Sequence, residues 1–383
     1  MIKKISLLGC TGSVGRQVVE VVKRYPDRFR IVALAANEGG RLFFEQTKEL
    51  APEFAALRSN GGEDLPLPAV TRFERGEQAF EEACAYPSAD VVFVAVSGFA
   101  GLKAALLALS AGKDVALANK ECLVAGGHLV NAAAAKSGAK ILPVDSEHSA
   151  VWQALGFDRR APFEKIILTA SGGALRDVPK EKLPQMTAKE ALAHPTWQMG
   201  DKITVDCATM LNKGYEVMEA MSLYGVPLEK VSVVMHRESI VHSMVAFADG
   251  AVLAQMSYPS MELPIQIALT YPERIYAGVP ALDLAKLGAL HFSEPDPERY
   301  PCFSLALACA REGGDAPCTL IGAGEAAVRA FLRGQIKFTQ IAQILESTLC
   351  RAPRGAAGDY AHLCETEARA RETAETFISR YGD

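Results

Sequence analysis

The sequence predicts an α/β fold with a doubly wound parallel sheet, then a central α+β region, then a C-terminal helical bundle. Strand-like and helix-like segments alternate through the first 144 residues, which is typical of parallel strands joined by right-handed crossovers. The alternation stops near residue 163, and only helical patterns occur from residue 302 onward. These observations together predict a Rossmann-like N-terminal domain followed by two regions of different architecture.

In the N-terminal domain the strands and helices are assigned from hydrophobic periodicity. Strands are expected at 2–8, 30–36, 90–96, 114–118 and 140–144, and helices at 16–24, 41–50, 77–85, 102–111 and 122–137. The segment 90–96 is continuously apolar, as in a strand that is covered on both faces of a sheet. Residues 51–76 contain several prolines and glycines and receive no assignment.

The rest of the chain divides into three further parts. Strands are expected at 165–170, 230–235, 243–247 and 251–256, and bundle helices at 303–311, 324–332, 339–349 and 359–380. We therefore expect a nucleotide-binding domain at 1–144, a catalytic domain at 145–270 with a lid at 185–201, a proline-rich linker at 271–301 and a helical domain at 302–383.

Composition excludes several classes of protein. Of the 383 residues 49% are hydrophobic, which is ample for large cores, and the net charge of −5 gives no reason to expect nucleic acid. The N-terminal apolar run ends at Gly9 in a glycine turn, so we expect no signal peptide. The apolar stretch 91–109 contains Ser97, Gly98, Gly101 and Lys103, which suits a buried strand and a packed helix better than a membrane span. Nine cysteines without a C-x-x-C pair indicate reduced thiols and a cytoplasmic protein.

Glycines at positions 9, 12 and 15 separate the first strand from the first helix. They permit a tight turn and close approach of a pyrophosphate to the helix N-terminus, so the segment predicts dinucleotide binding. The second strand ends at Asn37, followed by Glu38 and later Arg41. An acid there favours NAD whereas a nearby arginine suits the 2′-phosphate of NADP, so the choice of cofactor stays open.

A short strand at 140–144 runs directly into Asp145, Ser146 and Glu147. If this segment stays extended, its two carboxylates project from the same side and supply half of an oxygen cage for a divalent cation. The alternative is a helix N-cap, in which the acids favour the positive end of the helix. On this stretch alone the N-cap is the simpler interpretation.

Four other segments carry groups suited to anion or cofactor chemistry. Each also has a plain structural interpretation, as a turn, a helix start or a surface helix. They are Asn119, Lys120 and Glu121 after a strand, Ser171, Gly172 and Gly173 after another, His194 within the lid, and Asn212, Lys213 and Glu216 on one helix.

Taken together and in this order, the motifs resemble the 1-deoxy-D-xylulose 5-phosphate reductoisomerase family. The matching segments are 9–15, 118–121, 142–148, 171–173, 194–200, 206–214 and 335–339. The resemblance implies rearrangement and reduction of 1-deoxy-D-xylulose 5-phosphate to 2-C-methyl-D-erythritol 4-phosphate, in the non-mevalonate isoprenoid pathway. It also implies NADPH, a divalent cation (Mg²⁺, Mn²⁺ or Co²⁺), and a cytoplasmic homodimer.

The resemblance carries site roles onto this chain residue by residue. It places the metal on Asp145, Glu147 and Glu216, and catalysis on Lys120, Glu147 and His194. The substrate would contact Lys120, Ser146, Glu147, Ser171, His194, Cys207, Asn212, Lys213 and Glu216. Cofactor contacts would fall on Thr11, Gly12, Ser13, Val14, Asn37, Asn119, Glu121 and Gly200.

The chain departs from the family pattern at several positions. Cys207 and Cys122 stand where serines are usual, which predicts weaker phosphate binding at Cys207 because a thiol is a weak donor. Gly39 stands where an asparagine is frequent, which leaves some tolerance for NADH open. The segment 321–325 replaces a usual Asn-Ala-Ala-Asn-Glu, and we expect altered packing at the start of a bundle helix.

Two other functions fit parts of the pattern. A simple two-domain dehydrogenase would leave Asp145 and Glu147 structural and would need no metal. A non-catalytic protein that keeps the nucleotide fold would bind cofactor without turnover.

Overall fold

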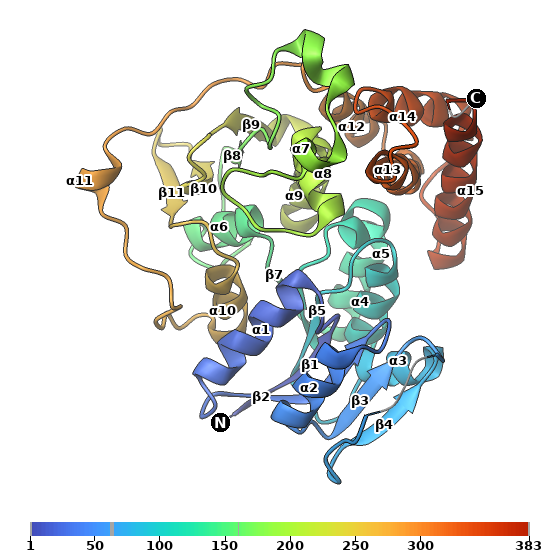
Figure 1. Cartoon of the computed structure of the whole chain (residues 1–383). Coiled ribbons are helices and arrows are strands. Elements are labelled where there is room, and N and C mark those ends of the chain that lie inside the picture. The colour runs from blue at the N-terminus through green and yellow to red at the C-terminus, as the bar shows by residue number, and fades with distance from the viewer. Residues whose placement is uncertain (1, 62–64, 160, 382–383) are drawn as a thin grey trace. The chain divides into compact units, whose positions relative to one another are not determined.

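The computed structural model describes residues 2–61, 65–159 and 161–381 (Figure 1). Within these residues the chain forms two compact units. The first comprises Met1–Cys122, His128–Ser149 and Met261–Val279, and the second comprises Leu123–Gly127, Ala150–Ser260 and Pro280–Asp383. Met1, residues 62–64, Arg160 and residues 382–383 lie outside the described part.

The first unit contains a fully parallel sheet of seven strands, in the order β4-β3-β2-β1-β5-β6-β7. The strands are β1 (Lys3–Leu8), β2 (Phe29–Ala36), β3 (Phe54–Leu57), β4 (Arg72–Arg75), β5 (Val91–Val94), β6 (Asp114–Leu117) and β7 (Ile141–Pro143). The strand order reverses between β1 and β5, and ligands of open α/β sheets bind at the carboxyl end of such a switch point. The predicted doubly wound parallel sheet is confirmed.

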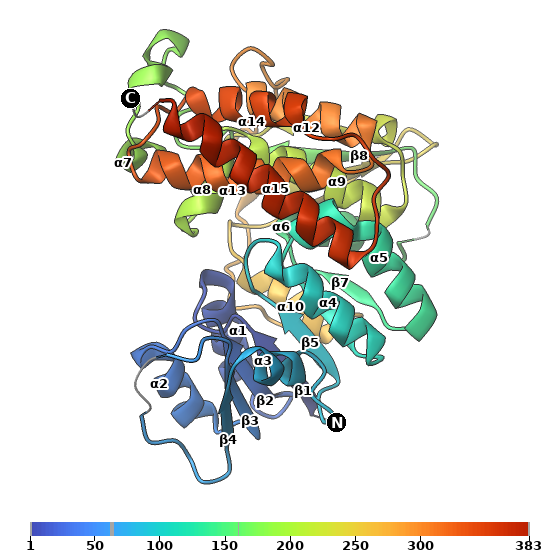
Figure 2. The same cartoon turned by 90° about the vertical axis from the view of Figure 1, so that its right-hand side faces the viewer.

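Helices cover both faces of this sheet (Figures 1 and 2). They are α1 (Ser13–Arg24), α2 (Arg41–Leu50), α3 (Glu77–Cys84), α4 (Ala100–Ser110), α5 (Glu121–Ser137) and α10 (Glu262–Thr270). Right-handed crossovers that run outward from β1 in opposite directions put α1 and α2 on one face and α3 and α4 on the other. The strands between them are buried on both sides, as the apolar run at Val91–Val94 predicts.

Two strands and one helix of this unit differ from the sequence-based expectation. The unassigned segment 51–76 contains β3 and β4, each only four residues long, and β4 is a half-exposed edge strand with charged ends at Arg72 and Arg75. The segment Met261–Val279, expected at the end of the catalytic domain and the start of the linker, belongs to the first unit.

Burial and ion pairs explain where the 261–279 segment lies. The apolar residues Ile265, Ile267 and Leu269 of α10 are at most 1% exposed, and α10 packs against α1, β6 and β7. Arg24 of α1 lies 2.6 Å from Glu262 and donates to the carbonyl of Ala277 at 2.7 Å. The compact units therefore do not follow the expected boundaries at residues 144, 270 and 301.

The second unit is built on a mixed four-stranded sheet in the order β11-β10-β8-β9. Its strands are β8 (Lys165–Ala170), β9 (Val231–Met235), β10 (Val241–Ala246) and β11 (Val252–Met256). Only β8 and β9 pair in parallel; β10 runs antiparallel to both β8 and β11. The remaining elements before the bundle are α6 (Ser146–Ala154), η1 (Lys180–Gln185), α7 (Ala188–Ala191), α8 (Asp201–Ala208), α9 (Leu211–Tyr224), η2 (Leu228–Lys230) and α11 (Leu284–Leu287).

The four predicted C-terminal helices are present and also belong to the second unit. They are α12 (Pro301–Glu312), α13 (Ala316–Leu332), α14 (Gln340–Arg351) and α15 (Tyr360–Ser379). Helix α13 begins eight residues before the expected start at 324. A Cβ at Gly322 would lie 2.5 Å from the carbonyl oxygen of Glu367, and one at Gly324 would lie 2.7 Å from the hydroxyl of Tyr215. The unusual glycines of 321–325 therefore let α13 approach its neighbours closely, in the middle of the helix rather than at its start.

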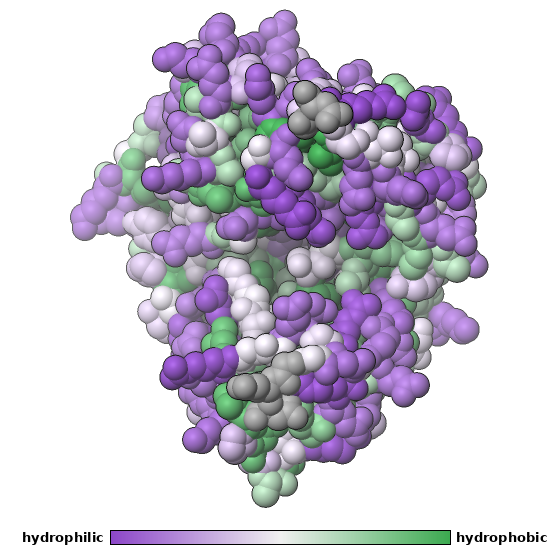
Figure 3. Space-filling view, turned by 45° about the vertical axis from the view of Figure 1, so that its right-hand side comes forward, coloured by the Kyte–Doolittle hydropathy of each residue, from purple (hydrophilic) through white to green (hydrophobic). Residues whose placement is uncertain are grey.

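Hydrophilic side chains cover most of the molecular face in Figure 3, with hydrophobic ones in smaller groups between them. Among the helices of the described residues, none combines the length and the apolar composition that a membrane crossing requires. The nine cysteines all lie in the described part, and none of them forms a disulfide.

Candidate active site

The glycine turn after β1 has the steric character that dinucleotide binding requires. Gly9 has a φ of +84°, and a Cβ there would lie 2.5 Å from the carbonyl oxygen of Ala95. A Cβ at Gly15, the third residue of α1, would lie 2.1 Å from the carbonyl oxygen of Gly9. The turn is thus held against the start of α1, whose first amide groups can face an anion. Gly12 is the N-cap, and Thr11, Ser13 and Val14 surround it.

The end of β2 holds the residues that the sequence analysis expects to choose between NAD and NADP. Asn37 and Glu38 are exposed, and the Asn37 carbonyl accepts a hydrogen bond from the Ser59 amide at 2.8 Å. Arg41 is also exposed, and its Nε lies 2.6 Å from Glu45, one turn along α2. A negative side chain, Glu38, and a positive one, Arg41, therefore both lie near the end of β2.

Asn119 is 1% exposed and its side chain is fully engaged within the first unit. It donates to the carbonyls of Val96 at 2.9 Å and Gly98 at 2.8 Å, and it accepts from the Cys122 amide at 2.9 Å. The Asn119 amide thus shapes the 96–98 turn after β5. The Cys122 thiol donates to the Asn119 carbonyl at 3.1 Å, a bond that a serine could also make.

Lys120 and Asp145 form a buried ion pair. The Lys120 ammonium lies 2.6 Å from Asp145 Oδ2, and the two side chains are 8% and 14% exposed. Lys120 is the N-cap of α5 and Asp145 follows β7, so both stand where the sheet strands end. The pair keeps a positive and a negative group at the edge where ligands of this fold bind.

The segment after β7 is helical, and the extended alternative for Asp145 to Glu147 is wrong. Helix α6 begins at Ser146, and the Asp145 carbonyl accepts from the Ser149 amide at 2.8 Å. Asp145 is therefore in the N-cap position, as the simpler interpretation predicted, because acids are favoured at the positive end of a helix. Ser146 donates to Glu147 at 2.5 Å. Glu121 occupies the equivalent first turn of α5.

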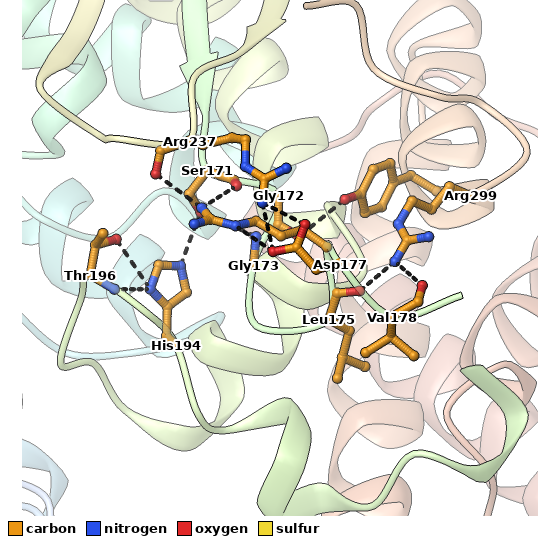
Figure 4. Close-up of polar contacts among 12 residues, drawn as sticks. Ser171, Gly172, Gly173, Leu175, Asp177, Val178, His194, Thr196, Arg237 and Arg299 are labelled. Atoms are coloured by element: carbon orange, nitrogen blue, oxygen red, sulfur yellow. Dashed lines mark hydrogen bonds and ion pairs between the residues drawn. The ribbon is translucent and has the colours of Figure 1, made fainter. Parts of the chain in front are cut away.

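In the second unit, β8 runs into a glycine loop that presents Ser171 (Figure 4). Gly172 and Gly173 have φ values of +81° and +71°, a conformation that side chains rarely adopt. A Cβ at Gly173 would lie 2.5 Å from the Cα of Ala208 and 2.6 Å from the carbonyl oxygen of Cys207. These glycines allow the loop to lie directly against the end of α8.

His194 contacts Ser171, and its tautomer follows from the hydrogen-bond network. Its Nδ1 accepts from the backbone amides of Thr196 at 3.2 Å and Trp197 at 3.0 Å, so the proton resides on Nε2. That Nε2 lies 3.0 Å from the Ser171 hydroxyl, to which it donates. Burial, with a smaller contribution from the charge of Arg176, lowers the pKa of His194 from 6.5 to about 4. The imidazole is therefore neutral near pH 7.

The corner between α8 and α9 presents a second set of polar groups. Met210 at this corner has a φ of +57°, and Asn212, Lys213 and Glu216 follow in the first turns of α9. Both Asn212 and Lys213 donate to the Glu216 carboxylate, and all three side chains are at most 7% exposed. Cys207 lies on α8, and Gly200 is the N-cap of that helix.

The structure thus gathers the expected residues in two groups. Thr11 to Val14, Asn37, Asn119 to Glu121 and Asp145 to Glu147 belong to the first unit. Ser171, His194, Gly200, Cys207 and the Asn212–Glu216 group belong to the second. Sequence reasoning did not identify Arg176, Arg299 and Tyr300, whose side chains donate to carbonyl groups of the Ser171 loop, the last from 128 residues away. It also did not identify the exposed Arg237–Asp177 ion pair beside the loop.

Three features define the class of protein: a nucleotide-type parallel sheet, a glycine turn against a helix start, and a second unit that presents the half-buried Ser171 hydroxyl and the buried Lys213 ammonium. They are typical of a dinucleotide-dependent enzyme that acts on an anionic substrate. Residues 5–127 match the model of 1-deoxy-D-xylulose 5-phosphate reductoisomerase, residues 141–224 match its C-terminal domain, and residues 256–373 match the DXP reductoisomerase C-terminal domain. The chain belongs to the 1-deoxy-D-xylulose 5-phosphate reductoisomerase family.

Relatives of that name are similar to the chain over most of its length. The protein from Thermomicrobium roseum is 49% identical over 349 residues, covering 91% of this chain and 90% of the relative. The protein from Ralstonia nicotianae is 44% identical over 387 residues and 98% of each chain.

Two solved structures share the fold at 35% sequence identity. The Zymomonas mobilis reductoisomerase in complex with NADPH has a TM-score of 0.89 and covers 99% of each chain. A DOX-P reductoisomerase in complex with NADPH, fosmidomycin and magnesium has a TM-score of 0.92 and covers 100% of each chain.

Proposed function

We propose that the protein converts 1-deoxy-D-xylulose 5-phosphate to 2-C-methyl-D-erythritol 4-phosphate, with NADPH and a divalent cation, in the non-mevalonate isoprenoid pathway. The observation that carries this proposal is the family relationship: named reductoisomerases match 91% to 98% of the chain at 44% to 49% identity. The glycine turn, the buried Lys120–Asp145 pair and the Ser171–His194 pair support it as chemistry.

The first unit fits NADPH. Because Gly9 and Gly15 leave no room for side chains, the backbone of the turn is open to a pyrophosphate, and α1 directs its amide groups there. Thr11 to Val14 would hold the pyrophosphate, while Asn37 and Glu38 lie at the strand end that faces the adenosine ribose in this fold. NADPH supplies a hydride when it is bound. Asn119, Glu121 and Gly200 are the remaining proposed cofactor contacts.

We propose that Asp145, Glu147 and Glu216 hold the divalent cation. The donor set consists of carboxylate oxygens alone, which suits Mg²⁺ or Mn²⁺ rather than a soft metal. Each acid already has a donor on its own unit: Lys120 for Asp145, Ser146 for Glu147, and Asn212 with Lys213 for Glu216. The cation supplies Lewis-acid polarisation of the hydroxyketone oxygens when it is bound.

Side chains of both units would act on the substrate. Lys120 would stabilise negative charge that develops on a substrate oxygen, since its ammonium group lies beside Asp145 where the sheet strands end. In the second unit, the Ser171 hydroxyl, the Lys213 ammonium and the Asn212 amide are donors suited to a phosphate. A neutral His194 fixes Ser171 without adding charge.

The substrate role of Cys207 rests on its position against the Ser171 loop. The Gly173 backbone packs on the carbonyl of Cys207, so the thiol stands on the helix end that supports the loop. A thiol donates more weakly than a hydroxyl, and phosphate binding is correspondingly weaker than with a serine. The 185–201 segment, which carries His194, would close over the substrate and exclude water.

One assay tests the proposed reaction against a simple dehydrogenase and a non-catalytic binder. We expect NADPH oxidation in the presence of 1-deoxy-D-xylulose 5-phosphate, abolished by EDTA and restored by Mn²⁺. Asp145→Asn and Glu216→Gln each lower kcat/KM by about 100-fold or more, since a metal ligand is removed. Glu229→Gln, an exposed acid beyond the end of α9, is the matched control and keeps full activity.

Metal binding can be measured apart from turnover. Titration calorimetry with Mn²⁺ should show one site in the wild type and weakened binding in both carboxylate variants. Unimpaired turnover or Mn²⁺ affinity in either variant would remove that residue from the metal site. Turnover that is insensitive to EDTA would favour the dehydrogenase interpretation.

We further propose a cytoplasmic homodimer. Strand β11 is an edge of the second sheet, and its Val252 and Leu253 are 50% and 51% exposed. An edge strand with exposed apolar side chains can pair with another chain. Light scattering of the purified protein should give twice the chain mass of 41.0 kDa. Thiols without disulfides suit a reducing compartment, and cell fractionation tests the location.

A further inference from the structure

The Ser171 hydroxyl has only one way left to form a further strong hydrogen bond. Its oxygen accepts from His194 Nε2 at 3.0 Å and from the Gly173 amide at 3.2 Å (Figure 4). A hydroxyl oxygen has two lone pairs and one hydrogen, so both acceptor positions are occupied. Ser171 is therefore committed to donate its hydrogen, and the matching ligand atom is an acceptor such as a phosphate oxygen.

The direction of the Gly173 amide is itself fixed from a distant part of the chain. The Tyr300 hydroxyl donates to the Gly172 carbonyl at 3.1 Å. The Gly172 carbonyl and the Gly173 amide belong to one planar peptide group and point in opposite directions. Holding the carbonyl on Tyr300 therefore aims the amide at Ser171. Without a Cβ, Gly172 can rotate about its φ and ψ more freely than other residues, so this peptide needs such an anchor.

Tyr300 is a suitable anchor because it stays protonated and immobile. It is 4% exposed, and burial raises the pKa of its hydroxyl above the usual value of 10. The preceding residue, Arg299, donates to the carbonyl of Val178 at 2.7 Å and also to that of Leu175. The 299–300 segment at the start of α12 thus binds the same loop through three of its carbonyl groups.

Arg176 holds the loop from the other side. Its Nη1 donates to the carbonyls of Ser171 and Arg237, each at 3.0 Å. Arg176 also lowers the pKa of His194, so a change there alters two properties at once. Tyr300 carries a neutral hydroxyl instead, and its substitution by phenylalanine removes one oxygen atom without a change of charge.

We propose that Tyr300 is a positioning residue for substrate phosphate binding, which acts through the Gly172–Gly173 peptide to hold Ser171 as a committed donor. This inference rests on the proposed function, since it takes the phosphate of the substrate as the acceptor. Tyr300, at the start of the C-terminal bundle, would thus contribute to substrate affinity. Arg299, through two neighbouring carbonyls, supports the same loop.

The test is Tyr300→Phe, measured in the full-length protein with 1-deoxy-D-xylulose 5-phosphate. We expect KM to rise about three- to tenfold, the range that corresponds to one lost hydrogen bond, with kcat changed by less than about twofold. The inhibition constant of fosmidomycin, a phosphonate, should rise by a similar factor. The dissociation constant of NADPH should stay unchanged.

Arg237→Gln is the matched control, because Arg237 lies between β9 and β10 and its side chain reaches the loop only at the surface, through Asp177. Arg237 lies 2.5 Å from Asp177, but the two side chains are 52% and 64% exposed. Exposed pairs contribute little, so KM should change by less than about twofold. Circular dichroism melts of both variants confirm that each is folded.

A double-mutant cycle with Ser171→Ala separates positioning from general stabilisation. If Tyr300 acts through Ser171, Tyr300→Phe should have little further effect on KM in the Ser171→Ala background. Equal effects of Tyr300→Phe in both backgrounds, or an unchanged KM in the single variant, would overturn the proposal. Absence of turnover by the wild type would instead refute the proposed function, and the two failures are therefore distinguishable.

Discussion

Gly15→Ala is predicted to destabilise the first unit and to weaken NADPH binding. The added Cβ would stand 2.1 Å from the Gly9 carbonyl oxygen and 2.7 Å from the Cys10 Cα. The first distance is about 0.9 Å below the 3.0 Å that Cβ atoms essentially never undercut, and both atoms are backbone. Relief therefore requires a shift of the turn itself relative to α1.

The magnitude follows from two opposing terms. Overpacking of a rigid site costs about 3 kcal/mol or somewhat more, whereas alanine in a helix is favoured over glycine by about 1 kcal/mol. The expected net loss is roughly 2–3 kcal/mol. Because the displaced turn also forms the proposed pyrophosphate site, the dissociation constant of NADPH should rise at least about tenfold, since 1.4 kcal/mol corresponds to a factor of ten.

The assay is urea unfolding followed by circular dichroism, together with NADPH titration by fluorescence. Gly12→Ala is the internal control for stability, because its Cβ would meet the Gly9 carbonyl at 3.3 Å and its φ of −70° suits any residue. It should lower the unfolding free energy by only about 0.5–1 kcal/mol, because alanine is a poorer N-cap than glycine but meets no comparable clash. Equal losses in the two variants, or wild-type stability of Gly15→Ala, would refute the steric argument.

Two further predictions concern charge. Because the pKa of His194 is lowered to about 4, the folded state binds fewer protons than the unfolded state between about pH 6.5 and 4, so stability is lost as pH falls through this window. His194→Gln should flatten that part of the urea midpoint against pH, and an unchanged slope would contradict the assignment. Glu38 is exposed at the strand end that is proposed to face the cofactor ribose. Glu38→Gln should therefore raise the ratio of kcat/KM for NADPH over that for NADH about two- to fivefold, as expected for the loss of one exposed charge interaction. Steady-state kinetics with both cofactors measure this ratio.

The nucleotide sheet could be predicted from the sequence because its signals are local. Glycines in a turn between a strand and a helix indicate that the backbone passes too close to its neighbours for a Cβ. The contacts at Gly9 and Gly15 leave no room for one. A continuous apolar run such as Val91–Val94 predicts a strand that is buried on both faces, and all four residues are buried. In these cases one short segment contains all the information.

The elements that were missed depend on long-range contacts. Strand β4 is a four-residue edge strand whose Arg72 pairs with Glu74 and Glu82 rather than with an apolar core. Helix α10 has a clear apolar face, but the sequence does not state which sheet that face covers. Its position in the first unit follows from partners such as Arg24, 238 residues earlier.

The same distinction applies to the site. The substrate-binding roles of Ser171, His194 and Lys213 stay predictions that rest on the family resemblance; by residue type, a hydroxyl, an imidazole and an ammonium group can each donate to an anion. The conformation of Asp145 could not be decided, because an extended turn and a helix N-cap have the same sequence signature. The structure decides it, because helix α6 begins at Ser146 and the Ser149 amide donates to the Asp145 carbonyl.

The supporting residues of the Ser171 loop illustrate why a motif search stops at the groups that would touch a ligand. Arg299 and Tyr300 carry no motif of their own, and each binds only backbone carbonyls of the loop. Such a bond depends on the fold and not on the side chains of the loop, so no pattern within 171–178 points to it. The Ser171 hydroxyl acts only as a donor as long as the Gly173 amide occupies one of its lone pairs, so the Gly172–Gly173 peptide has to be held in place by another group. Affinity for the phosphate in this chain is therefore expected to depend on the start of α12 as well as on the segment that carries the serine.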